Sequence, residues 1–201
     1  MDTYSVKKLF KDGSTEVSEE LIIKETPIKI YEKGEVVYET TAYPEKIRDL
    51  EEGFKFVHYY RKIRDFERTP NTYEKEDISN IIDGLSKTLS KSDLYKVGRC
   101  THCMALCSKD GPVFFGEDIS RHNALYKVIG DCFLHKRYPW QYYLCASSRM
   151  TYSMLEIIQK AGIDCVVTKS AVTDSAILMA RDFGIRMYGC ATEDMVKQYT
   201  D

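Results

Sequence analysis

The chain lacks an excess of charge of either sign, and it lacks any long apolar run. Its 29 Lys and Arg residues face 31 Asp and Glu, which gives a formal net charge of −2. Proteins that bind nucleic acid or anionic membranes carry a basic excess, so we predict neither kind of partner. No run of eighteen apolar residues occurs, which predicts that no helix spans a bilayer. The first ten residues also lack the apolar core of a signal peptide.

The cysteines lack the number and spacing of a disulfide framework. There are seven, an odd number, and Cys100, Cys103 and Cys107 lie within one short stretch. Such a cluster suits thiol or metal chemistry in a reducing compartment, so we predict a cytoplasmic protein. A length of 201 residues predicts one domain, or one domain with a small lobe.

The first half of the chain is typical of a small α+β lobe, which we assign to residues 1–95. The first twenty residues are polar and charged, and we expect them to be a loosely held lead-in. The following patterns predict a hairpin across Lys33-Gly34, a helix that begins at Pro44, a linker from Arg64 to Glu76, and a helix over Ile78 to Leu89.

The second half has a different pattern, which predicts a three-layer α/β/α domain over residues 96–201. His102–Ser108 and Pro112–Phe115 form an expected hairpin. Helical patterns then alternate with short apolar runs, as in βαβ units around a largely parallel sheet. The expected helices are Arg121–Leu134, Met150–Ala161 and Thr173–Phe183, and the expected strands are Tyr142–Ala146, Cys165–Thr168 and Arg186–Cys190.

Polar residues follow the expected strands where α/β proteins bind their ligands. The carboxyl ends of strands and the amino ends of helices meet there and attract anions. Ser147-Ser148-Arg149 and Lys169-Ser170 follow two strands, and Arg121-His122 opens a helix. We therefore predict an anion pocket. The alternatives are that Ser147, Ser148 and Thr173 only cap helices, that Glu117, Asp118, Arg121 and His122 form a structural ion-pair cluster, and that Asn123 is only a helix-entry residue.

The spacing of Cys100, Cys103 and Cys107, with His102 among them, is compatible with zinc or an iron–sulfur cluster. On a strand, however, Cys103 and Cys107 would face away from His102, which weakens a compact metal site. Cys100 lies beside Arg99, and a neighbouring cation activates a thiol, so Cys100 is the best candidate for a reactive cysteine. Zinc deaminase chemistry is excluded because no His is followed by x-Glu.

Five segments, in this order, resemble the formate dehydrogenase accessory protein family, also called formate dehydrogenase accessory sulfurtransferases. The most specific is Glu117-Asp118 with Arg121-His122-Asn123-Ala124-Leu125 and Lys127-Val128-Ile129-Gly130. The others are Glu25-Thr26-Pro27-Ile28, Tyr43-Pro44-Glu45 through Gly53-Phe54, Cys100-Thr101-His102, and Ser147-Ser148-Arg149 with Ser170-Ala171 and Thr173.

The resemblance implies a cytidine deaminase-like α/β domain with an N-terminal lobe, in a cytoplasmic homodimer without a permanent metal. It also implies that sulfur passes from a cysteine desulfurase to the molybdenum-bis(guanine dinucleotide) cofactor, destined for the formate dehydrogenase catalytic subunit. The bound ligand would be this cofactor or a guanine nucleotide. The implied binding residues are His102, Glu117, Asp118, Arg121, His122, Asn123, Ser148, Arg149, Ser170 and Thr173.

The chain departs from the family where the family carries its sulfur. The family's cysteines lie in a C-G-x-C loop, but the corresponding region, Arg61 to Tyr95, is short and contains no cysteine. The family's final G-x-x-x-V-Y-T stretch is also degraded here. Cys100, with Cys103, would then be the catalytic acceptor. The alternatives are a cofactor-binding or nucleotide-binding scaffold without sulfur transfer, and a metal-binding or redox module built on Cys100, Cys103 and Cys107.

Overall fold

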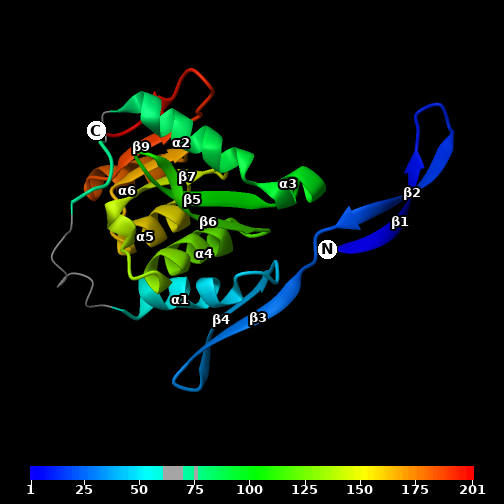
Figure 1. Ribbon diagram of the computed structural model, residues 1–201, viewed down its shortest axis with the longest axis horizontal. Coiled ribbons are helices and arrows are strands. Elements are labelled where there is room, and N and C mark those ends of the chain that lie inside the picture. Colours follow the sequence, from blue (N-terminus) through cyan, green and yellow to red (C-terminus); the bar gives the residue numbers. More distant parts are fainter. Residues whose placement is uncertain (61–69, 75–76) are drawn as a thin grey trace.

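The computed structural model describes residues 1–60, 70–74 and 77–201, and Figure 1 shows the arrangement of the elements. Two hairpins and a helix precede a larger α/β body. The elements are β1 (Asp2–Leu9), β2 (Thr15–Ile22), β3 (Thr26–Glu32), β4 (Glu35–Ala42), α1 (Ile47–His58), α2 (Ile78–Ser90), α3 (Asp93–Gly98), β5 (His102–Ser108), β6 (Gly111–Asp118), α4 (Arg121–Leu134), η2 (Pro139–Gln141), β7 (Tyr143–Ala146), α5 (Tyr152–Lys160), β8 (Cys165–Thr168), α6 (Asp174–Asp182), β9 (Arg186–Gly189) and β10 (Lys197–Gln198).

The body is built on a sheet with the strand order β10-β9-β8-β7-β5-β6. Strands β7, β8 and β9 are parallel, whereas β5 is antiparallel to both β6 and β7, and β10 is antiparallel to β9. The parallel pairing predicted for the alternating strands is confirmed for β7, β8 and β9, but the sheet as a whole is mixed, because β5 of the predicted hairpin also pairs antiparallel with β7. The reversal of β5 has a useful consequence: the carboxyl ends of β6, β7, β8 and β9 share one edge with the amino end of β5.

Helices cover both faces of this sheet, which confirms the predicted α/β/α layers. In Figure 1, α2 lies on one face, α4, α5 and α6 lie on the other, and α1 packs outside α4. The side chains of β5 alternate between the two cores as predicted, with Met104 and Leu106 in one and Ala105 and Cys107 in the other. The domain boundary at residue 95 stays a prediction, and α2 packs on strands that lie beyond it.

Helices α1 and α4 touch backbone to backbone. A Cβ atom on Gly130 would lie 1.8 Å from the carbonyl oxygen of Asp49, and one on Gly53 would lie 1.9 Å from that of Tyr126. Only glycine allows so close an approach, since any side chain would push the helices apart. The two glycines of the family-like segments therefore hold the helices together rather than bind a ligand.

The amino-terminal region differs most from expectation. The first twenty residues are not a loose lead-in but the β1–β2 hairpin, paired from Asp2↔Ile22 to Leu9↔Thr15. The sequence pattern did not predict this hairpin, because both of its faces are largely exposed and neither is consistently apolar. The β3–β4 hairpin and helices α1 and α2 are confirmed, although α1 begins at Ile47 rather than at Pro44. Most of the expected linker from Arg64 to Glu76 lies outside the described residues.

Neither α3 nor β10 was predicted, because each is too short to show a period. Within residues 1–60, 70–74 and 77–201, no helix is long and apolar enough to cross a bilayer.

Candidate functional site

Three helices begin along the edge where the carboxyl ends of β6, β7 and β8 lie. Helix α4 follows β6, α5 follows β7, and α6 follows β8. The residues that precede them, Ser120, Thr151 and Thr173, make no side-chain capping bond. The N–H groups of the first helical turns therefore lack these usual partners, and the edge favours negative charge. The alternative that Thr173 only caps its helix is wrong.

The loops after β7 and β8 lie side by side, as the anion-pocket prediction requires. Met150 and Val172 form a parallel bridge, and the backbone N–H of Thr173 donates to the carbonyl of Met150 at 3.1 Å. The Ser170 hydroxyl donates to the Ser147 carbonyl at 2.9 Å. The two polar bends therefore form one surface instead of two separate turns.

Three buried polar atoms on this edge have no hydrogen-bond partner among the described residues: Arg121 Nε, Ser148 Oγ and Thr173 Oγ1. Ser148 is 1% exposed, so its hydroxyl is also largely shielded from bulk water. Buried polar groups are nearly always paired, and leaving one unpaired costs about 1–3 kcal/mol. Three such atoms at adjacent helix starts fit a site that is completed by a ligand rich in oxygen.

The positive charges of two arginines act on a histidine at this edge. His102 is half-buried, and its pKa is lowered first by burial and then by the positive charges of Arg121 and Arg149. Both guanidinium groups therefore act on the same imidazole. His122 lies on the first turn of α4, where its Nε2 contacts Ser153 Oγ of α5 at 2.9 Å, so it also links two of the helix starts.

A cavity of about 600 Å³ opens at the amino end of β5 and reaches the same loops. Four of the predicted site residues line it: Cys100, His102, Cys103 and Ser170. Ser147 and Lys169 belong to the polar bends of the predicted anion pocket, but the part of the wall contributed by α3 and its flanks was not predicted. The full set of remaining lining residues is Leu89, Ser92, Tyr95, Arg99, Thr101, Ser147 and Lys169.

The two candidate catalytic cysteines differ sharply in their surroundings. Cys100 is exposed at the cavity. Cys103 is 1% exposed, burial raises its pKa, and its Sγ lies 3.9 Å from the Thr88 carbonyl. Because the thiolate is the nucleophile, a buried thiol with a raised pKa is a poor acceptor. The structure therefore favours Cys100 over Cys103 for thiol chemistry.

The cysteine spacing does not produce a compact cluster. Cys107 lies in the core, where its Sγ contacts that of Cys145 at 3.5 Å. Among the residues that the structure describes, no group of three or more His, Cys, Asp or Glu side chains is placed to hold a metal ion.

The predicted ligand-binding role of Glu117 needs a correction, because its carboxylate stabilises the fold. It accepts hydrogen bonds from the hydroxyls of Ser92 at 2.5 Å and Thr101 at 2.7 Å, and from the backbone N–H of Tyr95 at 3.0 Å. These partners lie at the start of α3 and beside the cavity. Glu117 therefore positions the cavity wall and does not itself line the cavity.

The predicted ligand-binding roles of Asp118 and Asn123 need the same correction. Asp118 is fully buried and pairs with Lys127 at 2.7 Å, so the structural ion-pair alternative is right for this acid. Asn123 is also fully buried; its amide donates to the Thr41 carbonyl at 2.8 Å and its oxygen accepts from the Tyr38 hydroxyl at 3.1 Å. Both residues fasten the β3–β4 hairpin region to α4, and neither faces the cavity.

The positive charges that act on His102 predict how its pKa changes when one of them is removed. Arg149→Gln is expected to raise the pKa of His102, because it removes a positive charge that disfavours the imidazolium. NMR titration of the His102 ring measures this shift, and Arg181→Gln, at the opposite edge of the sheet, serves as the control. An unchanged pKa in Arg149→Gln would contradict the convergence of these charges.

The sign of the linkage follows from the lowered pKa. The unfolded chain binds the His102 proton more tightly than the folded chain. The contribution of His102 to stability is therefore present above the ordinary value of 6.5 and is lost as the pH falls through the folded pKa.

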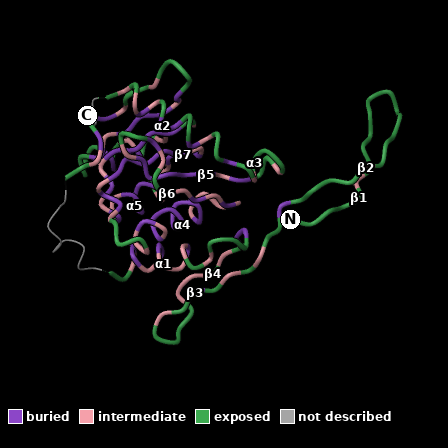
Figure 2. Tube along the Cα trace, viewed as in Figure 1, coloured by how far each residue is buried: buried purple, intermediate pink, exposed green. Residues whose placement is uncertain are grey.

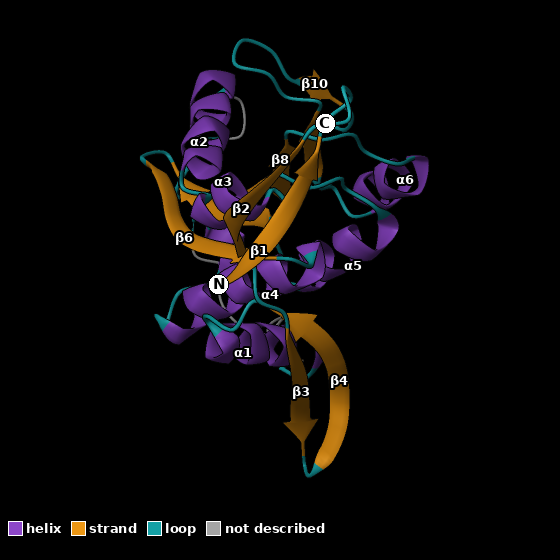
Figure 3. Cartoon of the chain, turned by 90° about the vertical axis from the view of Figure 1, so that its right-hand side faces the viewer, coloured by secondary structure: helices purple, strands orange, loops and turns teal. Residues whose placement is uncertain are grey.

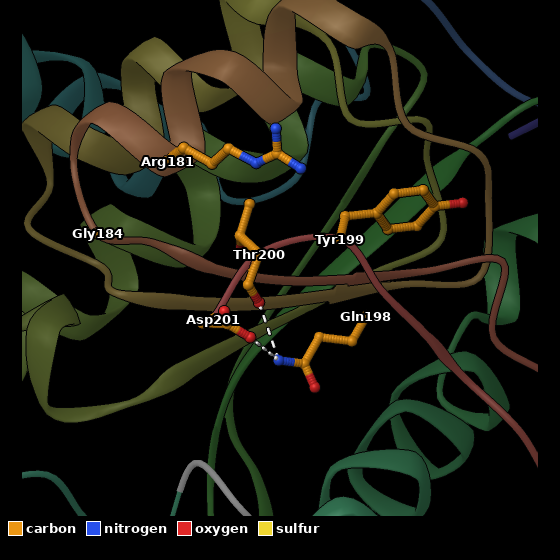
Figure 4. A pocket seen from close by; sticks show the side chains of 6 residues that line it. All are labelled: Arg181, Gly184, Gln198, Tyr199, Thr200 and Asp201. Atoms are coloured by element: carbon orange, nitrogen blue, oxygen red, sulfur yellow. Dashed lines mark hydrogen bonds between the residues drawn. The ribbon is translucent and has the colours of Figure 1, made fainter.

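A second cavity, of about 500 Å³, lies at the opposite edge of the sheet, near the amino end of β9 (Figure 4). The side chains there bond to one another: Gln198 donates to Asp201 at 3.0 Å. None of the predicted site residues lines it, and it holds no thiol or histidine. Its lining residues are Arg181, Gly184, Gln198, Tyr199, Thr200 and Asp201.

Curated relatives match a half to about two thirds of the chain. A sulfur carrier protein FdhD from Bacillus licheniformis is 37% identical over 99 residues, which is 49% of this chain and 38% of that protein. Another from Wolinella succinogenes is 29% identical over 138 residues, which is 69% of this chain and 47% of that protein. The aligned part therefore spans less than half the length of these relatives.

A solved structure and a family model complete the comparison. The crystal structure of a candidate formate dehydrogenase accessory protein from Desulfotalea psychrophila matches with a TM-score of 0.87 at 17% identity, covering 100% of this chain and 96% of that one. This match shows that the fold is shared over the whole chain. The model of the FdhD/NarQ family matches residues 57–201, so the chain belongs to the FdhD/NarQ family.

Proposed function

We propose that the chain is an accessory protein for the maturation of formate dehydrogenase, which holds a phosphate-rich guanine dinucleotide and carries sulfur on Cys100. One observation carries the proposal: the helix starts, the unpaired Arg121, Ser148 and Thr173 atoms and the exposed Cys100 lie along one edge of the sheet. The matched relatives are named sulfur carriers, which supports the sulfur half of this function.

The cation-rich edge would hold the phosphates. Arg121 and Arg149 would supply charged donors, and Ser148 and Thr173 would supply neutral ones. Guanidinium groups match phosphate oxygens with paired N–H bonds, and helix starts add backbone donors. The molybdenum cofactor is cargo in this function, and a guanine nucleotide is the part of it whose binding is simplest to measure.

The sulfur step would use the exposed thiol. The Cys100 thiolate would attack the terminal sulfur of a persulfide on a cysteine desulfurase. A new S–S bond forms to Cys100, the donor's S–S bond breaks, and the donor cysteine leaves as a thiolate, so no net oxidation occurs. Arg99 and Lys169, which line the same cavity, would stabilise the anionic forms of both sulfur atoms.

The remaining partners belong to the same proposal. The acceptor of the finished cofactor would be the formate dehydrogenase catalytic subunit, and the setting would be the reducing cytoplasm. The seven free cysteines suit that setting. A homodimer is the proposed assembly.

The binding half is tested with guanosine diphosphate as the probe. We expect Arg121→Gln to weaken its binding about tenfold or more, since a charged hydrogen bond contributes about 1.5–3 kcal/mol. Isothermal titration calorimetry on the full chain measures the affinity.

The matched control is Arg181→Gln, which removes an arginine at the far cavity and should leave the affinity unchanged. Equal affinities in all three proteins would overturn the anion pocket.

A further inference from the structure

The segment that carries Cys100 packs little of its own surface against the body. It runs from Ser92 to Thr101 and contains α3, which lies at one end of the body beside the base of the β1–β2 hairpin (Figures 1 and 3). Helix α3 has six residues, and none of them is buried (Figure 2). A helix of this length is not stable alone in water. Contacts with other elements must therefore hold the segment in place.

One carboxylate, that of Glu117 on β6, supplies such contacts at both ends of the segment. Its Oε1 accepts hydrogen bonds from the hydroxyls of Ser92 at 2.5 Å and Thr101 at 2.7 Å. The backbone N–H of Tyr95 donates to the same oxygen at 3.0 Å, and that of Leu94 donates to Oε2 at 3.3 Å. Ser92 precedes α3 and makes no capping bond of its own, so Glu117 caps this helix instead. The carboxylate therefore joins the start of α3 to the residue that follows the cysteine.

The chain between these two ends has an unusual and closely packed conformation. Arg99 ends α3 with a φ of 53°, and its backbone N–H donates to the Tyr95 carbonyl at 2.9 Å. Residues other than glycine rarely adopt this left-handed conformation and keep it where the surrounding structure fixes it. A Cβ atom on Gly98 would lie 2.4 Å from the Ile23 side chain and 3.3 Å from the Cys100 Sγ. The direction of the cysteine therefore depends on how both ends of the segment are held.

We propose that Glu117 is a positioning residue for sulfur transfer: through Thr101 and the start of α3, it holds the Cys100 thiol in place at the cavity. Its carboxylate does not line that cavity, so it acts through the segment and not on the sulfur itself. A thiolate that attacks an S–S bond must be aligned with the bond that breaks, so a loosened segment slows the transfer although the thiol is still present. This inference rests on the proposed function, because it concerns the thiol that carries the sulfur.

The rate of sulfur loading from a cysteine desulfurase provides the first test. Glu117→Ala is expected to lower this rate about tenfold or more, since a small misplacement of a reacting group has effects of this size. Glu117→Gln is expected to retain most of the rate, because its remaining oxygen can accept the three hydrogen bonds that Oε1 accepts. The reaction of Cys100 with a small maleimide should not slow in either variant, because the thiol stays exposed.

Two further variants complete the set. Thr101→Val removes one of the hydrogen bonds and keeps the shape of the side chain, so it should slow loading even if Glu117→Ala does not fold. The matched control is Glu156→Ala, which removes a carboxylate from the partly exposed Lys160–Glu156 pair and should load like the parent. Circular dichroism melting measures whether each variant is folded.

A nitroxide spin label on Cys100 measures how firmly this side chain is held, without any sulfur transfer. In a Cys190→Ser background, electron paramagnetic resonance spectra should show a restricted label in the parent and in Glu117→Gln, and a mobile label in Glu117→Ala and Thr101→Val. Equal mobility in all four proteins, or loading at the parental rate in both Glu117→Ala and Thr101→Val, would overturn the role of Glu117. A parent that takes up no sulfur would instead overturn the proposed function on which this role rests.

Discussion

Cys100→Ser is expected to abolish sulfur loading of the chain. Incubation with a cysteine desulfurase and cysteine should add sulfur to the parent protein, and intact-mass spectrometry should detect none on the variant. The reason is that a serine hydroxyl is not a thiolate nucleophile and cannot form a persulfide. The effect is complete rather than graded, because Cys100 is the exposed thiol of the cavity.

Two other cysteines serve as controls. Cys190→Ser removes a half-buried thiol that contacts the Tyr199 hydroxyl at 3.5 Å outside the cavity wall, so loading should persist. Cys103→Ser tests the second predicted acceptor, and its burial and raised pKa predict little loss.

Loading on Cys103 with Cys100 replaced would reverse the assignment. No loading of the parent at all would favour a cofactor-binding scaffold without sulfur transfer, a function that retains the anion pocket.

Lys127→Met is expected to lower the free energy of unfolding by about 3–5 kcal/mol, the cost of removing one partner from a buried ion pair. Lys127 is 1% exposed and bonds Asp118 at 2.7 Å and the Tyr43 carbonyl at 2.9 Å. Methionine has a similar shape, so the loss reports the unpaired charge of Asp118 rather than a cavity. Urea unfolding followed by circular dichroism measures the change.

The control is Lys160→Met, which removes the same chemical group from the partly exposed Lys160–Glu156 pair at 2.9 Å. A pair near the surface contributes about 0–1 kcal/mol, so this variant should remain close to the parent. Equal losses of unfolding free energy in the two variants would contradict the structural role assigned to Asp118.

The family-like segment from Glu117 to Gly130 shows where sequence reasoning succeeded and where it failed. Its residue types predicted a helix start beside an anion pocket, and Arg121 and His122 do lie at that edge. The binding roles expected for Glu117, Asp118 and Asn123 were not found in the structure. Glu117 bonds to α3, Asp118 to Lys127, and Asn123 to the β3–β4 hairpin. A carboxylate that binds a ligand and one that fastens a buried lysine have the same letter in the sequence.

The cavity shows a second limit. Its far wall comes from the short helix α3, whose six residues are less than two turns and show no hydrophobic period. The register of β5 was predicted correctly, because alternation is a local property of the strand. The burial of the Cys103 thiol, however, depended on α2, whose Thr88 carbonyl contacts it.

By itself the sequence determined most of the helices and strands from β3 onward, with α3 and β10 as exceptions, and the polar bends that follow the strands, because periodicity and turn residues act over a few neighbouring positions. Only the tertiary structure decided that three helix starts share one edge, that Glu117 and Asp118 bond to the fold, and that the charged first twenty residues form the β1–β2 hairpin. Those outcomes depend on strand order and on burial between segments far apart in the chain, as between Tyr38 and Asn123, which are 85 positions apart. Such contacts leave no local pattern in the chain.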